Sequence, residues 1–150
     1  MPEEFKHIVR IADTDLDGEK KVGYALSGIK GIGIRLAEII VRKAGVNPEA
    51  RLGSISDEEI KKIEDVIRRP SEYDIPGWLL NRAKDLKTGK DLHLIGPDLD
   101  LQIKSDIELM KKIKSWKGYR HAYGLKVRGQ KTRTTGRTKK AMVVKKKKRR

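Results

Sequence analysis

Cysteine is absent from this sequence of 150 residues. The chain therefore forms no disulfides, binds no metal through thiolates and has no cysteine nucleophile, which favours an intracellular protein. Asparagine and glutamine are scarce, at two residues each, beside abundant lysine and glutamate, a composition typical of thermophile proteins. No run approaches the ~18 apolar residues of a membrane-spanning helix, and the N-terminus lacks the apolar stretch of a signal peptide. We therefore expect no membrane partner.

Acidic residues are missing from the last part of the chain, where Glu108 is the final carboxylate. Residues 109–150 carry 18 Lys and Arg, whereas residues 1–100 hold 17 basic and 19 acidic side chains. A segment with such an excess of one charge repels itself and does not fold alone. We expect this segment to bind a polyanion, and nucleic acid supplies that counter-charge.

Apolar residues are also few, at 37% of the chain, while charged residues reach 38%. We expect one modest domain with a small core under a heavily charged surface, followed by an extension. Apolar spacing makes the fold mainly α-helical, with helices predicted over 20–27, 34–43 and from a Ser56–Glu59 capping box to Pro70. A β-prone run over 8–11 precedes a predicted turn at 13–18.

The second half of the chain is predicted to contain two more helices. The first covers 75–86 and anchors Trp78 and Leu79 in the core, and a small β-hairpin follows over 87–98. A longer helix covers 99–116, and periodicity ends after Gly118. One apolar stripe of the longer helix contains Ile103, Ile107, Met110 and Ile113.

The sequence contains no complete motif for metal binding or catalysis. Residues 13–18 imitate the start of a calcium-binding loop, but Tyr24 occupies the position that requires a bidentate glutamate. His7, His93 and His121 have no second ligand at metal-binding spacing. We expect no metal, no cofactor and no enzymatic activity.

A glycine-rich turn between the first two predicted helices is more informative. The sequence GIKGIGIR over 28–35 resembles a helix–hairpin–helix element that grips a nucleic-acid backbone. Free N–H groups at the start of the second helix favour a phosphate, and lysine and arginine add charge. The alternative is a packed turn whose glycines merely avoid clashes. The candidate binding residues are Lys30, Gly31, Gly33 and Arg35.

Aromatic residues interleave with basic ones after the long helix. Trp116, Tyr119 and Tyr123 alternate with lysines and arginines. Such a mixture suits irregular RNA, whose unstacked bases accept aromatic or guanidinium planes.

Residues 117–137, KGYRHAYGLKVRGQKTRTTGR, resemble the signature of the small-subunit ribosomal protein thirteen family. ALSGIKGIG over 25–33 is similar to the helix–two-turn–helix region of that family, and WLLNRAKD over 78–85 resembles its archaeal and eukaryotic form. Lys131 stands where many members have arginine, so a single point charge replaces a bidentate fork there.

The resemblance implies a structural constituent of the small ribosomal subunit, in the cytoplasm. The family binds rRNA at the top of the head, beside head protein nineteen. It also bridges to large-subunit rRNA and to a large-subunit protein of the number five family, and its basic tail runs toward transfer RNA.

On this chain the resemblance implies three parts: a helical RNA-binding domain over 1–98, a long helix over 99–117, and an extended basic tail over 118–150 that becomes ordered on rRNA. The implied rRNA contacts are Lys117, Arg120, His121, Arg128, Gln130, Lys131, Thr132, Arg133, Arg137, Lys139 and Lys140. The implied tail residues near transfer RNA are Lys145, Lys146, Lys147, Lys148, Arg149 and Arg150.

Two other functions are compatible with a basic chain. One is a DNA-binding or repair factor that uses the glycine-rich hairpin, although no catalytic cluster accompanies it. The other is a free DNA-compacting protein, which would bind duplex DNA as well as structured rRNA.

Overall fold

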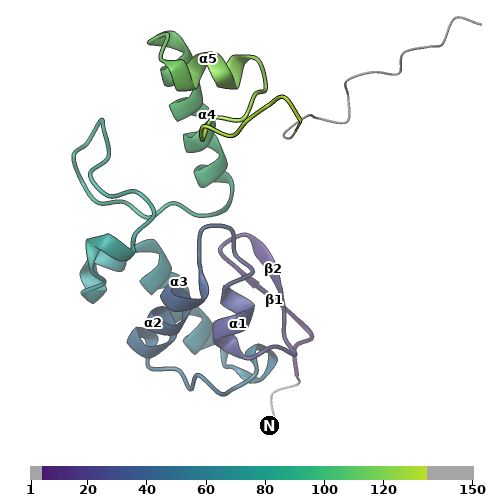
Figure 1. Cartoon of the computed structure of the whole chain (residues 1–150). Helices are drawn as coiled ribbons and strands as arrows, with labels where there is room; N and C mark the ends of the chain where they lie inside the picture. The colour runs from purple at the N-terminus through teal and green to yellow at the C-terminus, as the bar shows by residue number, and fades with distance from the viewer. Residues whose placement is uncertain (1–4, 135–150) are drawn as a thin grey trace, which may run out of the picture. The chain divides into compact units, whose positions relative to one another are not determined.

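The computed structural model describes residues 5–134 and divides the chain into two compact units, with the boundary between Leu101 and Gln102 (Figure 1). Helices dominate, as predicted, beside one two-stranded antiparallel sheet in the described range. Within residues 5–134, no helix is both long enough and apolar enough to cross a bilayer.

The first unit begins with a β-hairpin of β1 (Ile8–Ile11) and β2 (Thr14–Asp17), which pair from Ile8–Asp17 to Ile11–Thr14. Ala12 and Asp13 form a two-residue turn with positive φ at both positions, as in the tight hairpins that match strand twist. The predicted turn over 13–18 is therefore wrong, because residues 14–17 form a strand. Leu16 is the one buried side chain of this acidic strand. The strand therefore lacks the apolar alternation that would have predicted it.

Helices α1 (Val22–Leu26), α2 (Ile34–Ala44) and α3 (Asp57–Arg68) confirm three predicted helices. The capping box is also confirmed, since the Glu59 N–H donates to Ser56 Oγ at 3.4 Å and the Ser56 N–H donates to Glu59 Oε2 at 3.2 Å. Gly45 ends α2 in the left-handed conformation.

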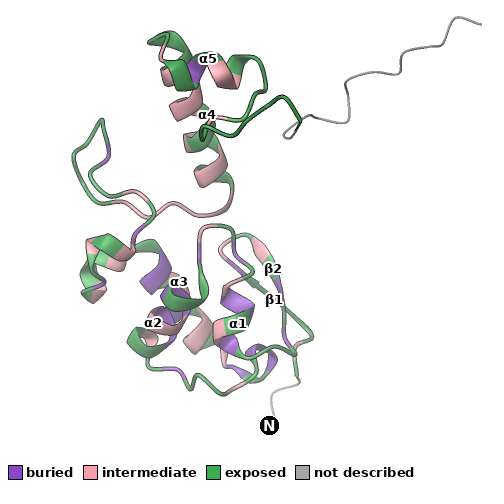
Figure 2. Cartoon of the chain, in the orientation of Figure 1, coloured by how far each residue is buried: buried purple, intermediate pink, exposed green. Residues whose placement is uncertain are grey.

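Among the described residues the core lies in the first unit, where Figure 2 shows buried residues in β1, β2 and α1–α3 and in the short 3-10 turn η1 (Leu52–Ser54). In the described part of the second unit, only Gly118 is buried. The buried apolar side chains are Val9, Ile11, Leu16, Val22, Ala25, Leu26, Ile29, Ile32, Leu36, Ala37, Ile40, Val41, Val46, Leu52, Ile55, Ile63, Val66, Ile67, Ile75 and Leu80.

The predicted helix over 75–86 is wrong. After the 3-10 turn η2 (Pro70–Tyr73), only another short turn, η3 (Gly77–Leu79), forms there. Trp78 is 79% exposed and anchors nothing, whereas Leu79 packs partly against the core. The chain instead forms a loop closed by a pair of backbone hydrogen bonds between Arg82 and Leu92. This pairing begins five residues before the predicted hairpin over 87–98.

The predicted single helix over 99–116 is replaced by α4 (Gly96–Lys112) and α5 (Trp116–Ala122). The break lies at Lys114, whose φ of 56° reverses the chain. Residues 118–122, which were expected to belong to an extended tail, are helical. None of the side chains of α4 is buried, so its predicted apolar stripe covers no core.

Candidate nucleic-acid interface

The glycine-rich turn packs against the chain leading into α4, within the first unit. Gly31 has a φ of +106°, and a Cβ atom there would lie 2.6 Å from the carbonyl oxygen of Leu94. The Gly96 N–H also donates to the Lys30 carbonyl at 2.8 Å. Gly31 therefore serves close packing, which is one of the two alternatives that the sequence left open.

The other side of the same turn is open. Gly33 is the N-cap of α2 and has no side chain to cap it, and a Cβ atom there would meet no atom of the described residues within 4 Å. Lys30 Nζ bonds Asp100 at 2.6 Å, and Arg35 Nη1 lies 3.4 Å from Glu38 Oε2. Both pairs are exposed, so each contributes little to stability and a phosphate can replace the carboxylate at small cost.

In the second unit, Ser115 connects α4 to α5. Its hydroxyl donates to the Met110 carbonyl at 3.0 Å and accepts from the Gly118 N–H at 3.1 Å, which caps α5. The two helices approach so closely that a Cβ atom on Gly118 would lie 2.1 Å from the Met110 carbonyl oxygen. The sequence did not single out Ser115, although a serine three residues before a glycine and just ahead of aromatic residues is a readable cap signal.

Arg120 links the last turn of α5 to the loop that follows it. Its Nε and Nη2 donate to the Lys126 carbonyl at 2.9 and 2.8 Å, and its guanidinium carbon lies 5.8 Å from the Trp116 ring centroid. Gly124, with a φ of +65°, ends the helix, while the Leu125 N–H donates to the Arg120 carbonyl at 2.9 Å. Arg120 therefore shapes the loop as well as carrying charge.

The structure brings Lys117, Arg120 and His121 together on α5, where Lys117 is exposed and the other two are half-buried. The exposed predicted residues that follow in the chain are Arg128, Gln130, Lys131, Thr132 and Arg133. The remaining predicted residues, Arg137, Lys139, Lys140 and Lys145–Arg150, lie outside the described residues.

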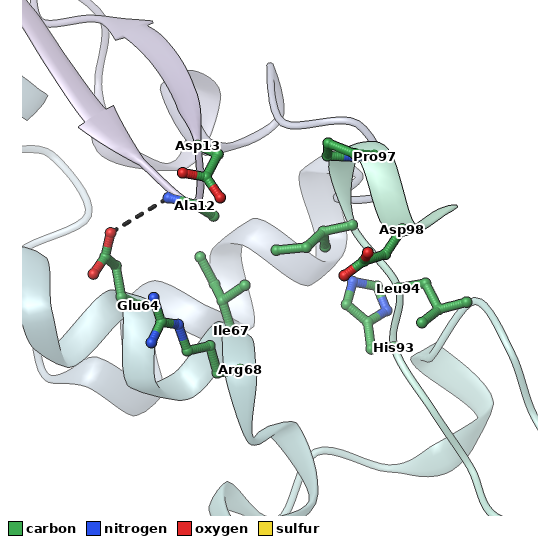
Figure 3. Close-up of a pocket in the computed structure, with 10 residues that line it drawn as sticks. Ala12, Asp13, Glu64, Ile67, Arg68, His93, Leu94, Pro97 and Asp98 are labelled. Carbon is green, nitrogen blue, oxygen red and sulfur yellow. Dashed lines mark hydrogen bonds between the residues drawn. The ribbon is translucent and has the colours of Figure 1, made fainter. Parts of the chain in front are cut away.

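A hollow of about 310 Å³ lies beside the β1–β2 turn in the first unit (Figure 3). Figure 3 shows the Ala12 N–H donating to Glu64, at 3.3 Å. His93 Nδ1 accepts from the Asn81 N–H at 3.4 Å, and burial lowers the pKa of the imidazole. Its Nε2 is buried and has no hydrogen-bond partner among residues 5–134. The hollow thus holds a neutral histidine, and the described part of the chain contains no group of three or more metal-ligating side chains.

Comparisons with known proteins identify the family of this chain. The family model described as ribosomal protein S13/S18 matches residues 10–138. Relatives named small ribosomal subunit protein uS13 include one from Staphylothermus marinus, 59% identical over 97% of this chain and 96% of the relative. Another, from Methanopyrus kandleri, is 53% identical over 97% of each chain, and one from Pyrobaculum islandicum is 58% identical over 91% of this chain and 89% of the relative. This chain therefore belongs to the ribosomal protein S13/S18 family.

Proposed function

We propose that this protein is a structural, non-enzymatic constituent of the small ribosomal subunit and binds its rRNA. The observation that carries the proposal is the run from Leu109 to Thr134, which contains nine Lys and Arg and no carboxylate. Among the described residues of that run only Gly118 is buried, so the charges face solvent or lie near it. Such a surface needs a dense array of phosphates, which folded rRNA provides.

The two units have different roles in rRNA binding in this proposal. The first unit docks through its folded surface and through the open side of the glycine-rich turn, at Gly33 and Arg35. The basic residues of 118–150 neutralise rRNA phosphates, and those up to Ala122 do so from the α5 helix. The Lys145–Arg150 cluster extends toward transfer RNA.

The resemblance to the family supports the remaining partners. We propose contacts with large-subunit rRNA and a large-subunit protein of the number five family, at a bridge between the subunits. Head protein nineteen is the proposed neighbour within the small subunit.

Charge-removing variants test the rRNA assignment. The double substitution Arg128→Gln/Arg133→Gln removes two exposed cations, and Lys61→Gln/Lys62→Gln removes two exposed cations from α3 as the matched control. We expect the first variant to reduce the salt slope of small-subunit rRNA binding by about 1.4, at about 0.7 per phosphate contact. The control leaves the slope unchanged, and equal effects of the two variants contradict the proposed surface.

Competition with duplex DNA separates this proposal from a DNA-binding factor. The full chain is expected to stay on structured rRNA when duplex DNA of equal phosphate concentration is added. Displacement by the duplex contradicts rRNA as the partner.

A further inference from the structure

Three exposed aromatic rings lie along one face of α5 and of Tyr123, the residue that follows the helix. Trp116 and Tyr119 stack with centroids 5.7 Å apart and planes 8° apart, and Tyr123 follows at 4.6 Å from Tyr119. Their exposed fractions are 72%, 50% and 66%. The spacing of three and then four residues aligns the rings along a single side of the helix. Each ring thus leaves much of its surface in solvent. Covering this apolar surface with a ligand lowers the free energy of the complex.

Hydrogen bonds hold both ends of the helix that carries the rings. Ser115 caps its first turn, and Gly124 closes its last turn. Arg120 lies over Trp116 and is fixed by its two hydrogen bonds to Lys126. Little conformational entropy remains to be lost when a ligand covers this face.

A hollow of about 230 Å³ lies beside the middle ring. It is lined by Lys111, Lys114, Gly118, Tyr119 and Ala122, so a mainly apolar floor is flanked by two lysines. None of the five residues that line the hollow is acidic. The face therefore offers flat apolar surfaces and positive charge in the same place.

We propose that the face formed by Trp116, Tyr119 and Tyr123 is a stacking site for unpaired bases of single-stranded RNA. This site rests on the proposed rRNA-binding function. It would select the unpaired bases of the RNA, which charge alone does not distinguish. Every base has a flat face that stacks on an aromatic ring, and the adjoining lysines hold the phosphates of the same strand. A protein partner would need acidic side chains beside apolar ones, and it would not need the parallel stacking of Trp116 and Tyr119, beside which Tyr123 is tilted by 45°.

The test compares two RNA probes with equal charge. One is a short unstructured RNA oligonucleotide, and the other has the same length but lacks its bases at the central positions. The full-length protein is expected to bind the intact probe more tightly. Trp116→Leu and Tyr123→Leu, which replace the two most exposed rings, weaken binding to the intact probe on the order of 5- to 150-fold. The same variants bind the abasic probe as the unsubstituted protein does.

Two control variants complete the design. Lys117→Gln removes a cation from α5 but no ring, so it weakens binding to both probes by similar factors and lowers the salt slope by about 0.7. Trp116→Phe keeps a flat ring and retains the preference for the intact probe. An α5 that keeps its backbone amide spectrum in each variant shows that the effect is not unfolding.

Fluorescence gives a second readout. In the Trp78→Phe background the only indole is Trp116, and stacking of a base on it quenches its emission on addition of the intact probe alone. If Trp116→Leu and Tyr123→Leu bind both probes like the unsubstituted protein, the stacking site is overturned while charge-driven rRNA binding stands. If the unsubstituted protein binds neither probe nor rRNA, the proposed function fails as well.

Discussion

At the scale of single residues, Asp85 organises the loop between Arg82 and Leu92. Its side chain is only 8% exposed, accepts from Arg82 Nε at 2.6 Å and from the Thr88 hydroxyl at 3.0 Å, and also accepts from the Thr88 N–H at 3.1 Å. The bond from Arg82 lowers the pKa of the carboxyl from 3.8 to about 2. A lowered pKa in the folded state means that the ionised form stabilises the loop.

We therefore expect the loop to lose order as the pH falls from about 4 to about 2. Above pH 4 the carboxylate is ionised in both states and its full contribution is present, and below pH 2 it is protonated in both states and that contribution is lost. NMR shifts of the Thr88 amide report the transition. Asp85→Asn abolishes it, and a midpoint near pH 4 in the unsubstituted protein contradicts the lowered pKa.

Gly118 offers a second prediction at this scale. Gly118→Ala places a methyl group against the backbone of Met110, which does not move aside as a flexible side chain does. We expect a loss of about 1–3 kcal/mol in the stability of the α4–α5 connection, measured as faster amide hydrogen exchange in α5. Gly23→Ala is the matched control, because a Cβ atom there meets nothing within 4 Å. Equal protection in the two variants would show that the close approach has no energetic consequence.

At the scale of elements, sequence and structure agree where caps and apolar periodicity coincide. α2 and α3 have both, and their predicted ranges differ from the observed ones by a residue or so. The predicted helix over 75–86 failed because polar side chains satisfy the backbone there. Asn81 Oδ1 accepts from the Leu94 N–H at 2.9 Å, and Asp85 accepts from the Thr88 N–H. Such bonds compete with helical ones, and the bond between Asn81 and Leu94 joins residues thirteen positions apart, which periodicity does not reveal.

The break between α4 and α5 was missed for a different reason. Ile113 and Trp116 continue the helical spacing of the preceding turns, so the pattern extends through a residue whose backbone reverses. At the reversal Lys114 adopts a left-handed conformation, with a φ of 56°, which is strained for lysine. Glycine at this position would have been visible in the sequence as a helix end.

This geometry predicts a stabilising substitution. Lys114→Gly relieves the left-handed strain and is expected to stabilise the connection by about 1 kcal/mol, allowing for the greater entropy of glycine in the unfolded chain. Lys104→Gly removes the same charge from a helical position of α4 and is expected to destabilise by about 1 kcal/mol. Hydrogen exchange of the α4 and α5 amides measures both changes. Effects of the same sign contradict the assigned backbone role of Lys114.

At the scale of the whole molecule, charge distribution was the most predictable property. Composition alone predicts a segment that binds a polyanion, since the C-terminal excess of basic residues needs no knowledge of the fold. It does not indicate that Lys30 is paired with Asp100, seventy positions away in the sequence. It also does not indicate that Arg120 turns its guanidinium toward the Lys126 carbonyl. Both depend on how the chain folds back on itself, so the number of cations available to phosphates is smaller than the number in the sequence.

Salt dependence measures that available number for the full chain. If about ten of the 18 cations beyond Glu108 each neutralise a phosphate, the slope of log K against log salt approaches about −7, at about −0.7 per contact. A chain ending at Thr134 keeps nine of the 18, so its slope should fall to about half while the RNA protections made by α5 and the first unit persist. Filter binding over a salt series and footprinting on small-subunit rRNA provide the two readouts. An unchanged slope in the shortened chain would place the phosphate contacts before residue 135, and the basic terminus would then need another ligand.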